Sequence, residues 1–248
     1  MTTLVEFFRQ HPKVALCFSG GVDSSFLLYF AVESGVKIRP YFIKTQFQPA
    51  FELDDGIRLT KECGIDLQVI EADVLENPDV IRNDELRCYY CKRRLFGILT
   101  KTALRDGFST VIDGSNASDD CEDRPGMRAK EELGVLSPLR ECGLTKSEIR
   151  DRSRAAGLFT WNKPAYACLA TRIPVGESIT EQKLKKIEMS EQYLSSLGFV
   201  DFRVRLFNGC ARIQLPDDQM QRLLERKDDI LSAFSDFDGV FLDLEGRT

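Results

Sequence analysis

The sequence predicts an α/β fold, a doubly wound parallel sheet followed by a small C-terminal α+β domain. Strand-like and helix-like patterns alternate through the first two thirds of the 248 residues, which is typical of a parallel sheet covered on both faces. A turn rich in glycine and serine, residues 19–25, follows the first apolar run, where such sheets bind ligands. We expect one domain over residues 1–160 and a second over residues 161–248.

The predicted elements follow in order. In the first domain we expect strands over 14–18, 36–46, 67–71 and 110–113, and helices from about 24, over 51–62, over 88–104 and over 145–156. Thr145 and Glu148 are spaced as a capping box, and Gly157 is placed to end that helix. Residues 161–178 break both periodicities and mark the crossing into the second domain. There we expect a helix over 181–197, a hairpin, a helix over 217–234 and a strand over 240–244.

The turn at residues 19–25 reads Ser-Gly-Gly-Val-Asp-Ser-Ser. Its glycines let the backbone approach a ligand closely, its serines add donors, and the following helix start aims free N–H groups at the same point. Such a nest favours a phosphate or pyrophosphate, although the Walker A lysine is absent. A serine-capped helix after a glycine turn is the alternative. The candidate ligand-binding residues are Ser19, Gly20, Gly21, Asp23, Ser24 and Ser25.

Composition limits the classes of function. A formal net charge of -5 argues against broad nucleic-acid binding. No apolar segment approaches the roughly 20 residues that span a bilayer, and no signal pattern is seen, so we expect a cytoplasmic protein. The eight cysteines are then expected to be thiols, metal ligands or catalytic groups. A single histidine, His11, disfavours histidine-based catalysis.

The hairpin of the second domain can be predicted residue by residue. Asn208-Gly209 favours a two-residue type I′ turn. Arg205 then faces Arg212, and Arg203 shares their face, opposite an apolar one. Like charges placed opposite each other destabilise a hairpin by about 0.2–1 kcal/mol, a cost that a bound anion would remove. Three solvated surface arginines are the alternative.

Three further motifs carry a family resemblance. They are Arg87-Cys88-Tyr89-Tyr90-Cys91-Lys92, the acidic loop from Asp113-Gly114-Ser115-Asn116 through Asp120, and Lys163-Pro164 leading to Cys168-Leu169-Ala170-Thr171-Arg172. With the 19–25 loop, which resembles the PP-loop of the ATP pyrophosphatases, they resemble the LarE-type ATP-dependent sulfur transferases of nickel-pincer nucleotide biosynthesis. The resemblance extends from about Val14 to Arg212.

The resemblance implies a reaction and its site. ATP would adenylate a carboxylate of a pyridinium dicarboxylate mononucleotide, pyrophosphate would leave, and a sulfur nucleophile would displace AMP. Residues of the PP-loop would hold ATP, with Asp23 required, and Mg²⁺ would accompany the phosphates. The residues that would bind the substrate's phosphate are Arg203, Arg205 and Arg212. The acidic loop would sit over the nucleotide, although Ser115 and Ser118 depart from the family pattern. The family also suggests a homo-oligomer.

The cysteines suggest how sulfur is delivered. Cys88 and Cys91 share one face at a helix start, and Cys168 lies on a loop; the resemblance implies that the three ligate a 4Fe-4S cluster. In the family's other route, a lone cysteine at the position of Cys168 gives up its own sulfur. Zinc or a dithiol couple remains an alternative for the pair. The cysteines expected to be ordinary reduced thiols are Cys17, Cys63, Cys121, Cys142 and Cys210.

Two other functions stay open. A PP-loop tRNA-thiolating enzyme combines similar motifs, but it would normally carry a basic RNA-binding module, and the chain's pI of about 5.2 shows no sign of one. A non-catalytic adenine-nucleotide or metal sensor would bind ATP without turnover. Release of pyrophosphate would separate the sensor from either enzyme.

Overall fold

The computed structural model describes residues 3–119 and 124–247. The chain forms two compact units. The first contains the residues up to Val74 together with Leu86–Lys163, and the second contains Leu75–Glu85 together with the residues from Pro164 onward.

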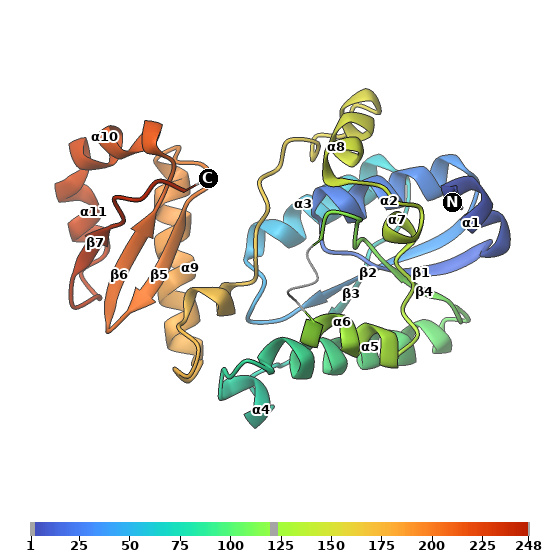
Figure 1. Cartoon of the computed structure of the whole chain (residues 1–248), viewed down its shortest axis with the longest axis horizontal. Coiled ribbons are helices and arrows are strands. Elements are labelled where there is room, and N and C mark those ends of the chain that lie inside the picture. The colour runs from blue at the N-terminus through green and yellow to red at the C-terminus, as the bar shows by residue number, and fades with distance from the viewer. Residues whose placement is uncertain (1–2, 120–123, 248) are drawn as a thin grey trace. The chain divides into compact units, whose positions relative to one another are not determined.

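The first unit is built on a parallel sheet, which confirms the predicted fold class (Figure 1). Its strands are β1 (Lys13–Cys17), β2 (Lys37–Lys44), β3 (Gln68–Glu71) and β4 (Val111–Asp113). They lie in the order β3-β2-β1-β4, and each neighbouring pair is parallel. The chain therefore winds outward from β1 to β3 and then reverses, so the topological switch point lies between β1 and β4, where open α/β sheets bind ligands.

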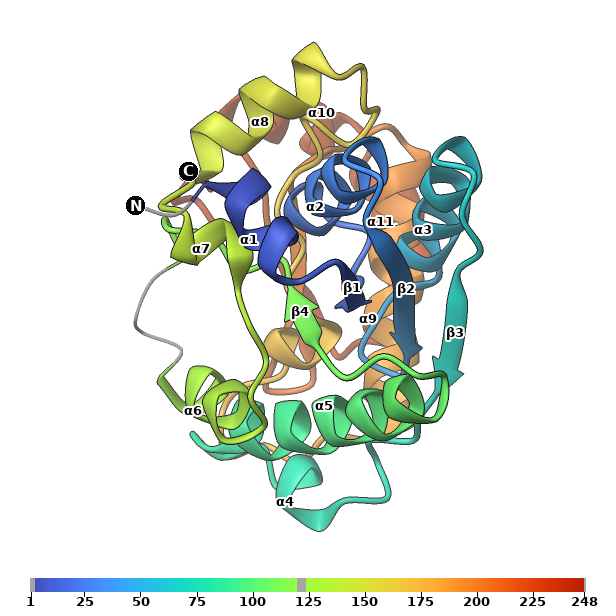
Figure 2. The same ribbon diagram turned by 90° about the vertical axis from the view of Figure 1, so that its right-hand side faces the viewer.

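Helices cover both faces of this sheet (Figure 2). They are α1 (Leu4–Gln10), α2 (Val22–Glu33), α3 (Ala50–Glu62), α5 (Arg87–Arg105), α6 (Arg124–Glu132), α7 (Pro138–Glu141) and α8 (Lys146–Ala155). Val14 and Leu16 of β1 pack with α1, α2, α3 and α8 in one apolar cluster, whereas Ala15 packs with α5 in another. Because successive strand residues point to opposite faces and both faces are covered, β1 is apolar after Lys13, over Val14, Ala15, Leu16 and Cys17.

The second unit has a three-stranded sheet. Its strands are β5 (Arg203–Phe207), β6 (Cys210–Gln214) and β7 (Val240–Leu242), and its helices are α4 (Pro78–Ile81), a 3-10 turn over Leu169–Arg172, α9 (Glu181–Ser196), α10 (Asp217–Glu225) and α11 (Lys227–Ala233). β6 pairs antiparallel with β5 and parallel with β7. The unit includes a segment from the middle of the chain. Asn83, fully buried, donates from its side-chain amide to the carbonyls of Pro174 and Glu177 at 2.7 and 2.9 Å.

The hairpin register confirms the prediction. Arg205 lies opposite Arg212, and the two turn residues have positive φ, 48° at Asn208 and 80° at Gly209, as a type I′ turn requires. The helix predicted over 217–234 is instead two helices, α10 and α11. They break at Arg226, whose backbone leaves the helical region at φ −103° and ψ 18°.

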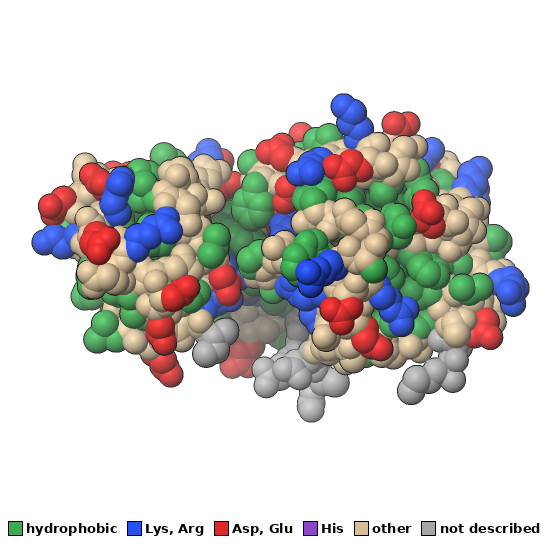
Figure 3. All heavy atoms as spheres, turned by 90° about the horizontal axis from the view of Figure 1, so that it is seen from above, with side chains coloured by type: hydrophobic (Ala, Val, Ile, Leu, Met, Phe, Trp, Pro, Cys, Tyr) green, Lys and Arg blue, Asp and Glu red, His purple; other side chains and the backbone are tan. Residues whose placement is uncertain are grey.

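Acidic and basic side chains are interspersed over the face of the molecule seen in Figure 3. Within the described residues, none of the helices is both long enough and apolar enough to cross a membrane.

Candidate functional site

The PP-loop lies after β1, beside the loop that follows β4 at the switch point. Gly20 has a φ of +72°, and a Cβ there would lie 2.8 Å from the carbonyl oxygen of Glu52. A Cβ on Gly114, in the β4 loop, would lie 2.8 Å from the backbone nitrogen of Ser24. Gly20 therefore lets the PP-loop pack against α3, and Gly114 lets the β4 loop pack against the start of α2.

Ser19 and Ser24 form hydrogen bonds within the PP-loop. The Ser24 hydroxyl accepts from the backbone N–H of Ser19 at 3.3 Å and lies 3.0 Å from the Ser19 hydroxyl. Gly21 caps α2 without a side-chain hydrogen bond to the first turn. The Ser25 hydroxyl is buried and has no partner. Unfilled donors at a helix start are what a phosphate group would satisfy.

Asp23 carries an unsatisfied oxygen at the same place. Its Oδ2 accepts from Lys146 Nζ at 2.6 Å, while its buried Oδ1 has no partner. Burial raises the pKa of the Asp23 carboxyl, and the Lys146 ammonium partly offsets this. An unpaired carboxylate oxygen beside a phosphate nest suits a Mg²⁺ ion that accompanies ATP. These residues therefore fit the Mg²⁺ that the resemblance implies.

Two lysines near the loop were not predicted from the sequence as site residues. Besides Lys146, Lys163 donates to Asp55 Oδ2 at 2.6 Å and to the Gly20 carbonyl at 3.2 Å. The PP-loop thus lacks the Walker A lysine but has two ammonium groups from later segments. Lys163 belongs to the Lys163-Pro164 motif, and this motif was the signal that could have identified it as a site residue. Lys146 directly follows the helix cap at Thr145.

Asp113 holds the β4 loop together. It is buried, forms an ion pair with Lys130 Nζ at 2.8 Å, and accepts from the hydroxyls of Ser115 and Ser137 at 2.9 and 2.7 Å. Further along, Asn116 donates to both carboxylate oxygens of Asp119. These contacts stabilise the loop itself. Asp120 lies outside the described residues.

The three hairpin arginines have different environments. Arg212 is half-exposed and pairs with Asp243. Arg205 donates to Gln214 Oε1 and to the Thr171 carbonyl, both at 2.6 Å. Burial, followed by the positive charges of Arg172 and Arg247, lowers the pKa of Arg205.

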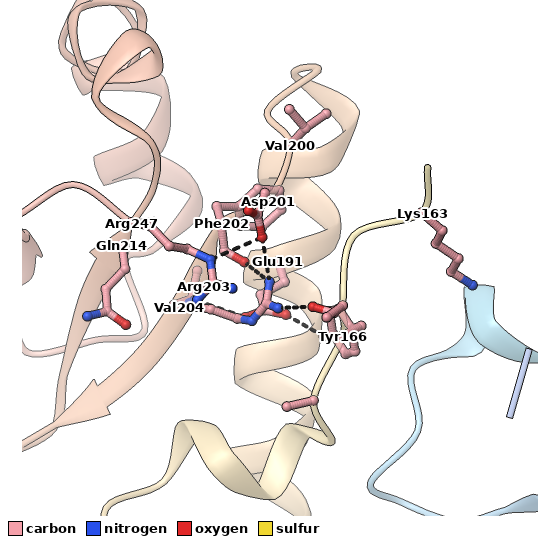
Figure 4. Close-up of polar contacts among 12 residues, drawn as sticks. Lys163, Tyr166, Glu191, Val200, Asp201, Phe202, Arg203, Val204, Gln214 and Arg247 are labelled. Carbon is pink, nitrogen blue, oxygen red and sulfur yellow. Dashed lines mark hydrogen bonds and ion pairs between the residues drawn. The ribbon is translucent and has the colours of Figure 1, made fainter. Parts of the chain in front are cut away.

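Arg203 is buried rather than solvated. Figure 4 shows its guanidinium directed toward the segment that carries Tyr166. It donates to the carbonyl oxygens of Phe202 and Ala165 and lies 3.8 Å from the carboxylate of Asp201. Burial, with the charges of Arg172 and Arg247, lowers the pKa of Arg203 to about 10.

The candidate cluster ligands belong to both units. Cys88 and Cys91 lie in the first two turns of α5, and the Cys88 sulfur accepts from Arg87 Nη2 at 3.7 Å. Cys168 caps the 3-10 turn of the second unit. Within residues 3–119 and 124–247, no group of three or more His, Cys, Asp or Glu side chains is arranged to hold a metal ion. The three cysteines are divided between the two units, so their convergence on one 4Fe-4S cluster stays a prediction.

Three of the remaining described cysteines are partly shielded thiols with raised pKa values. Burial raises the pKa of Cys17 to about 12, with a smaller contribution from Asp113. Burial also raises the pKa of Cys63 and of Cys142. At neutral pH these three remain thiols. Cys210 lies on the hairpin, and Cys121 falls outside the described residues.

The chain is similar along nearly its full length to a protein whose name states a function. It is 31% identical over 248 residues to the pyridinium-3,5-bisthiocarboxylic acid mononucleotide synthase of Lactiplantibacillus plantarum, covering 98% of this chain and 90% of the relative. The chain belongs to the LarE family. It is also 36% identical to an uncharacterized protein of Synechocystis, over 99% of this chain and 94% of that one. No family model matches the chain.

More distant relatives place LarE proteins in a wider group. The tRNA-specific 2-thiouridylase of Thermotoga sp. strain RQ2 is 24% identical over 61% of this chain and 54% of its own length. Both names describe enzymes whose products carry sulfur. The comparisons thus support an enzyme of sulfur transfer that contains a PP-loop.

Proposed function

We propose that this LarE-family protein uses ATP to convert a ring carboxylate of a pyridinium dicarboxylate mononucleotide into a thiocarboxylate. The carboxylate oxygen attacks the α-phosphorus of ATP and pyrophosphate leaves, giving an acyl adenylate. A sulfur nucleophile then attacks the acyl carbon, and AMP leaves with the former carboxylate oxygen. The observation that carries the proposal is the nest after β1, where Asp23 Oδ1 and the Ser25 hydroxyl are buried and unpaired.

The chain's residues would divide the work. PP-loop N–H groups and hydroxyls bind the phosphates, and Lys146 and Lys163 supply positive charge beside them. Mg²⁺, held by Asp23 and the phosphates, would offset their charge and make pyrophosphate a better leaving group. Arg203, Arg205 and Arg212 bind the substrate's phosphate. Cytoplasmic location and a closed homo-oligomer complete the proposal.

Sulfur delivery depends on Cys168 in either route. A 4Fe-4S cluster on Cys88, Cys91 and Cys168 would supply exchangeable sulfide. Alternatively, Cys168 is consumed. Iron and sulfide analysis after anaerobic reconstitution, on wild type and Cys88→Ala, distinguishes the two. Iron bound by wild type and lost in Cys88→Ala supports the cluster. Absence of iron, with Cys168 losing the mass of one hydrogen sulfide per product sulfur, shows the sacrificial route.

The experiment for the reaction is a product analysis. With ATP, a sulfur source and the substrate mononucleotide, we expect AMP and pyrophosphate in equal amounts and a thiocarboxylate product. ADP and phosphate as the main products would contradict the proposal. A parallel assay uses unmodified tRNA in place of the mononucleotide, because some relatives are named as tRNA-specific 2-thiouridylases. Sulfur incorporation into tRNA alone would favour the thiolase function, and nucleotide binding without any turnover would indicate a sensor.

A further inference from the structure

The segment that carries Cys168 is held by hydrogen bonds to its backbone carbonyl oxygens. Arg203 donates to the carbonyl of Ala165, Arg172 Nη1 to that of Ala167 at 3.2 Å, and Arg205 Nη1 to that of Thr171 at 2.6 Å. Three arginines therefore fix the chain on both sides of Cys168.

Thr171 donates twice to the carbonyl of Cys168 itself. The Thr171 backbone N–H lies 2.9 Å from this oxygen, and the Thr171 hydroxyl lies 2.8 Å from it. The same hydroxyl oxygen accepts from Arg172 Nη1 at 2.8 Å. A continuous chain of hydrogen bonds thus joins Arg172 to the backbone of Cys168.

At its other end, this chain of hydrogen bonds reaches a buried carboxylate. Glu191 of α9 pairs with Arg172 through Nε at 2.8 Å and Nη2 at 3.3 Å, and their side chains are only 6% and 1% exposed. Glu191 also accepts from the Tyr166 hydroxyl and from the Val204 N–H of β5, the latter at 2.9 Å. It therefore ties α9 and β5 to both ends of the Cys168 segment.

We propose that Glu191, Arg172 and Thr171 are positioning residues that set the direction of the Cys168 side chain for sulfur transfer. The proposal rests on the proposed function, in which Cys168 serves sulfur delivery in either route. None of the three needs to touch the substrate. A displacement of about 1 Å in a reacting group can lower a rate on the order of 100-fold, so loss of the bond from the Thr171 hydroxyl to Cys168 is expected to slow sulfur transfer and to spare adenylation.

Thr171→Val tests this, because it removes the hydroxyl and keeps the side-chain shape. Thr171→Ser is the matched control that keeps the hydroxyl. With ATP, substrate and labelled pyrophosphate, we expect pyrophosphate exchange in Thr171→Val within about twofold of wild type. Thiocarboxylate formation should fall by about 10- to 100-fold, mostly in kcat, and Thr171→Ser should recover most of it. The backbone amide hydrogen of residue 171 should also exchange faster with solvent in Thr171→Val than in Thr171→Ser.

Other outcomes overturn the proposal. Wild-type sulfur transfer in Thr171→Val would show that the hydroxyl does not position Cys168. An equal fall in exchange and in product would assign Thr171 to adenylation instead. If Thr171→Val melts well below wild type, Thr171→Ala replaces it under the same criteria. Absence of exchange in the wild-type protein would refute the proposed function itself, which is a separate result.

Discussion

Replacing Asp23 by asparagine is expected to stabilise the ligand-free protein while abolishing its response to ATP. The substitution removes a charge whose Oδ1 is buried without a partner. An unsatisfied buried acceptor costs about 1–3 kcal/mol, and a neutral amide costs less there than a carboxylate. The lost ion pair with Lys146, whose side chain is 32% exposed, is worth about 1 kcal/mol or less. The expected gain in the free energy of unfolding is therefore about 0–2 kcal/mol.

The difference in the free energy of unfolding between Asp23→Asn and wild type should depend on pH. Burial raises the pKa of folded Asp23 above its ordinary value of 3.8, so the folded protein keeps this proton to higher pH than the unfolded chain does. The stability of wild type relative to Asp23→Asn should then fall as pH rises from 3.8 through the folded pKa, and level off above it.

Urea unfolding with and without ATP and Mg²⁺ provides the assay. At an ATP concentration 100 times its dissociation constant, wild type should gain about 2.7 kcal/mol, and Asp23→Asn should gain nothing. Asp66→Asn, at an exposed position, is the control and should behave as wild type. Two results would refute the reasoning: a variant more than about 2 kcal/mol less stable than wild type without ligand, or one that keeps the ATP-dependent gain.

Three further variants test the site. Lys130→Met should cost about 3 kcal/mol in urea unfolding, because it leaves the buried carboxylate of Asp113 without its cation; a loss below about 1 kcal/mol would contradict this. Gly20→Ala should cost more than Gly35→Ala and should abolish ATP binding, since both have positive φ but only Gly20 faces a clash; equal losses in melting experiments would be inconsistent with that clash. Arg212→Ala should change stability by at most about 1 kcal/mol, as its ion pair is half-exposed, and should raise the substrate Kd at least tenfold; unchanged Kd in titrations would remove it from the site.

Local patterns explain what could be predicted. The hairpin register depends on Asn208-Gly209 and on strict alternation beside it. The capping box of α8 joins Thr145 to Glu148, three residues away. The parallel sheet likewise follows from local patterns, because short strand-like runs alternate with helix-like ones along the first two thirds of the chain. Helix α1 was not predicted, although Thr3 and Glu6 form a second capping box that the sequence displays.

The rest depends on contacts between distant segments. Arg203 is buried because Ala165 and Tyr166 lie over it, and nothing in the hairpin sequence indicates this. Lys163 reaches Asp55 from 108 residues away. One signal was available: Glu191 stands on the apolar stripe of α9 with Ile187 and Leu194, and a carboxylate at such a position predicts a buried cationic partner.

The anchoring of Asn83 bears on how this protein can be divided or recombined. The second unit takes residues 75–85 from between β3 and α5, and Asn83 supplies it with hydrogen bonds to the carbonyls of Pro174 and Glu177. A fragment that begins at Pro164 would expose these carbonyl groups. The second unit therefore cannot be grafted onto another protein as a simple C-terminal module; a functional exchange must carry both pieces, or join them by circular permutation.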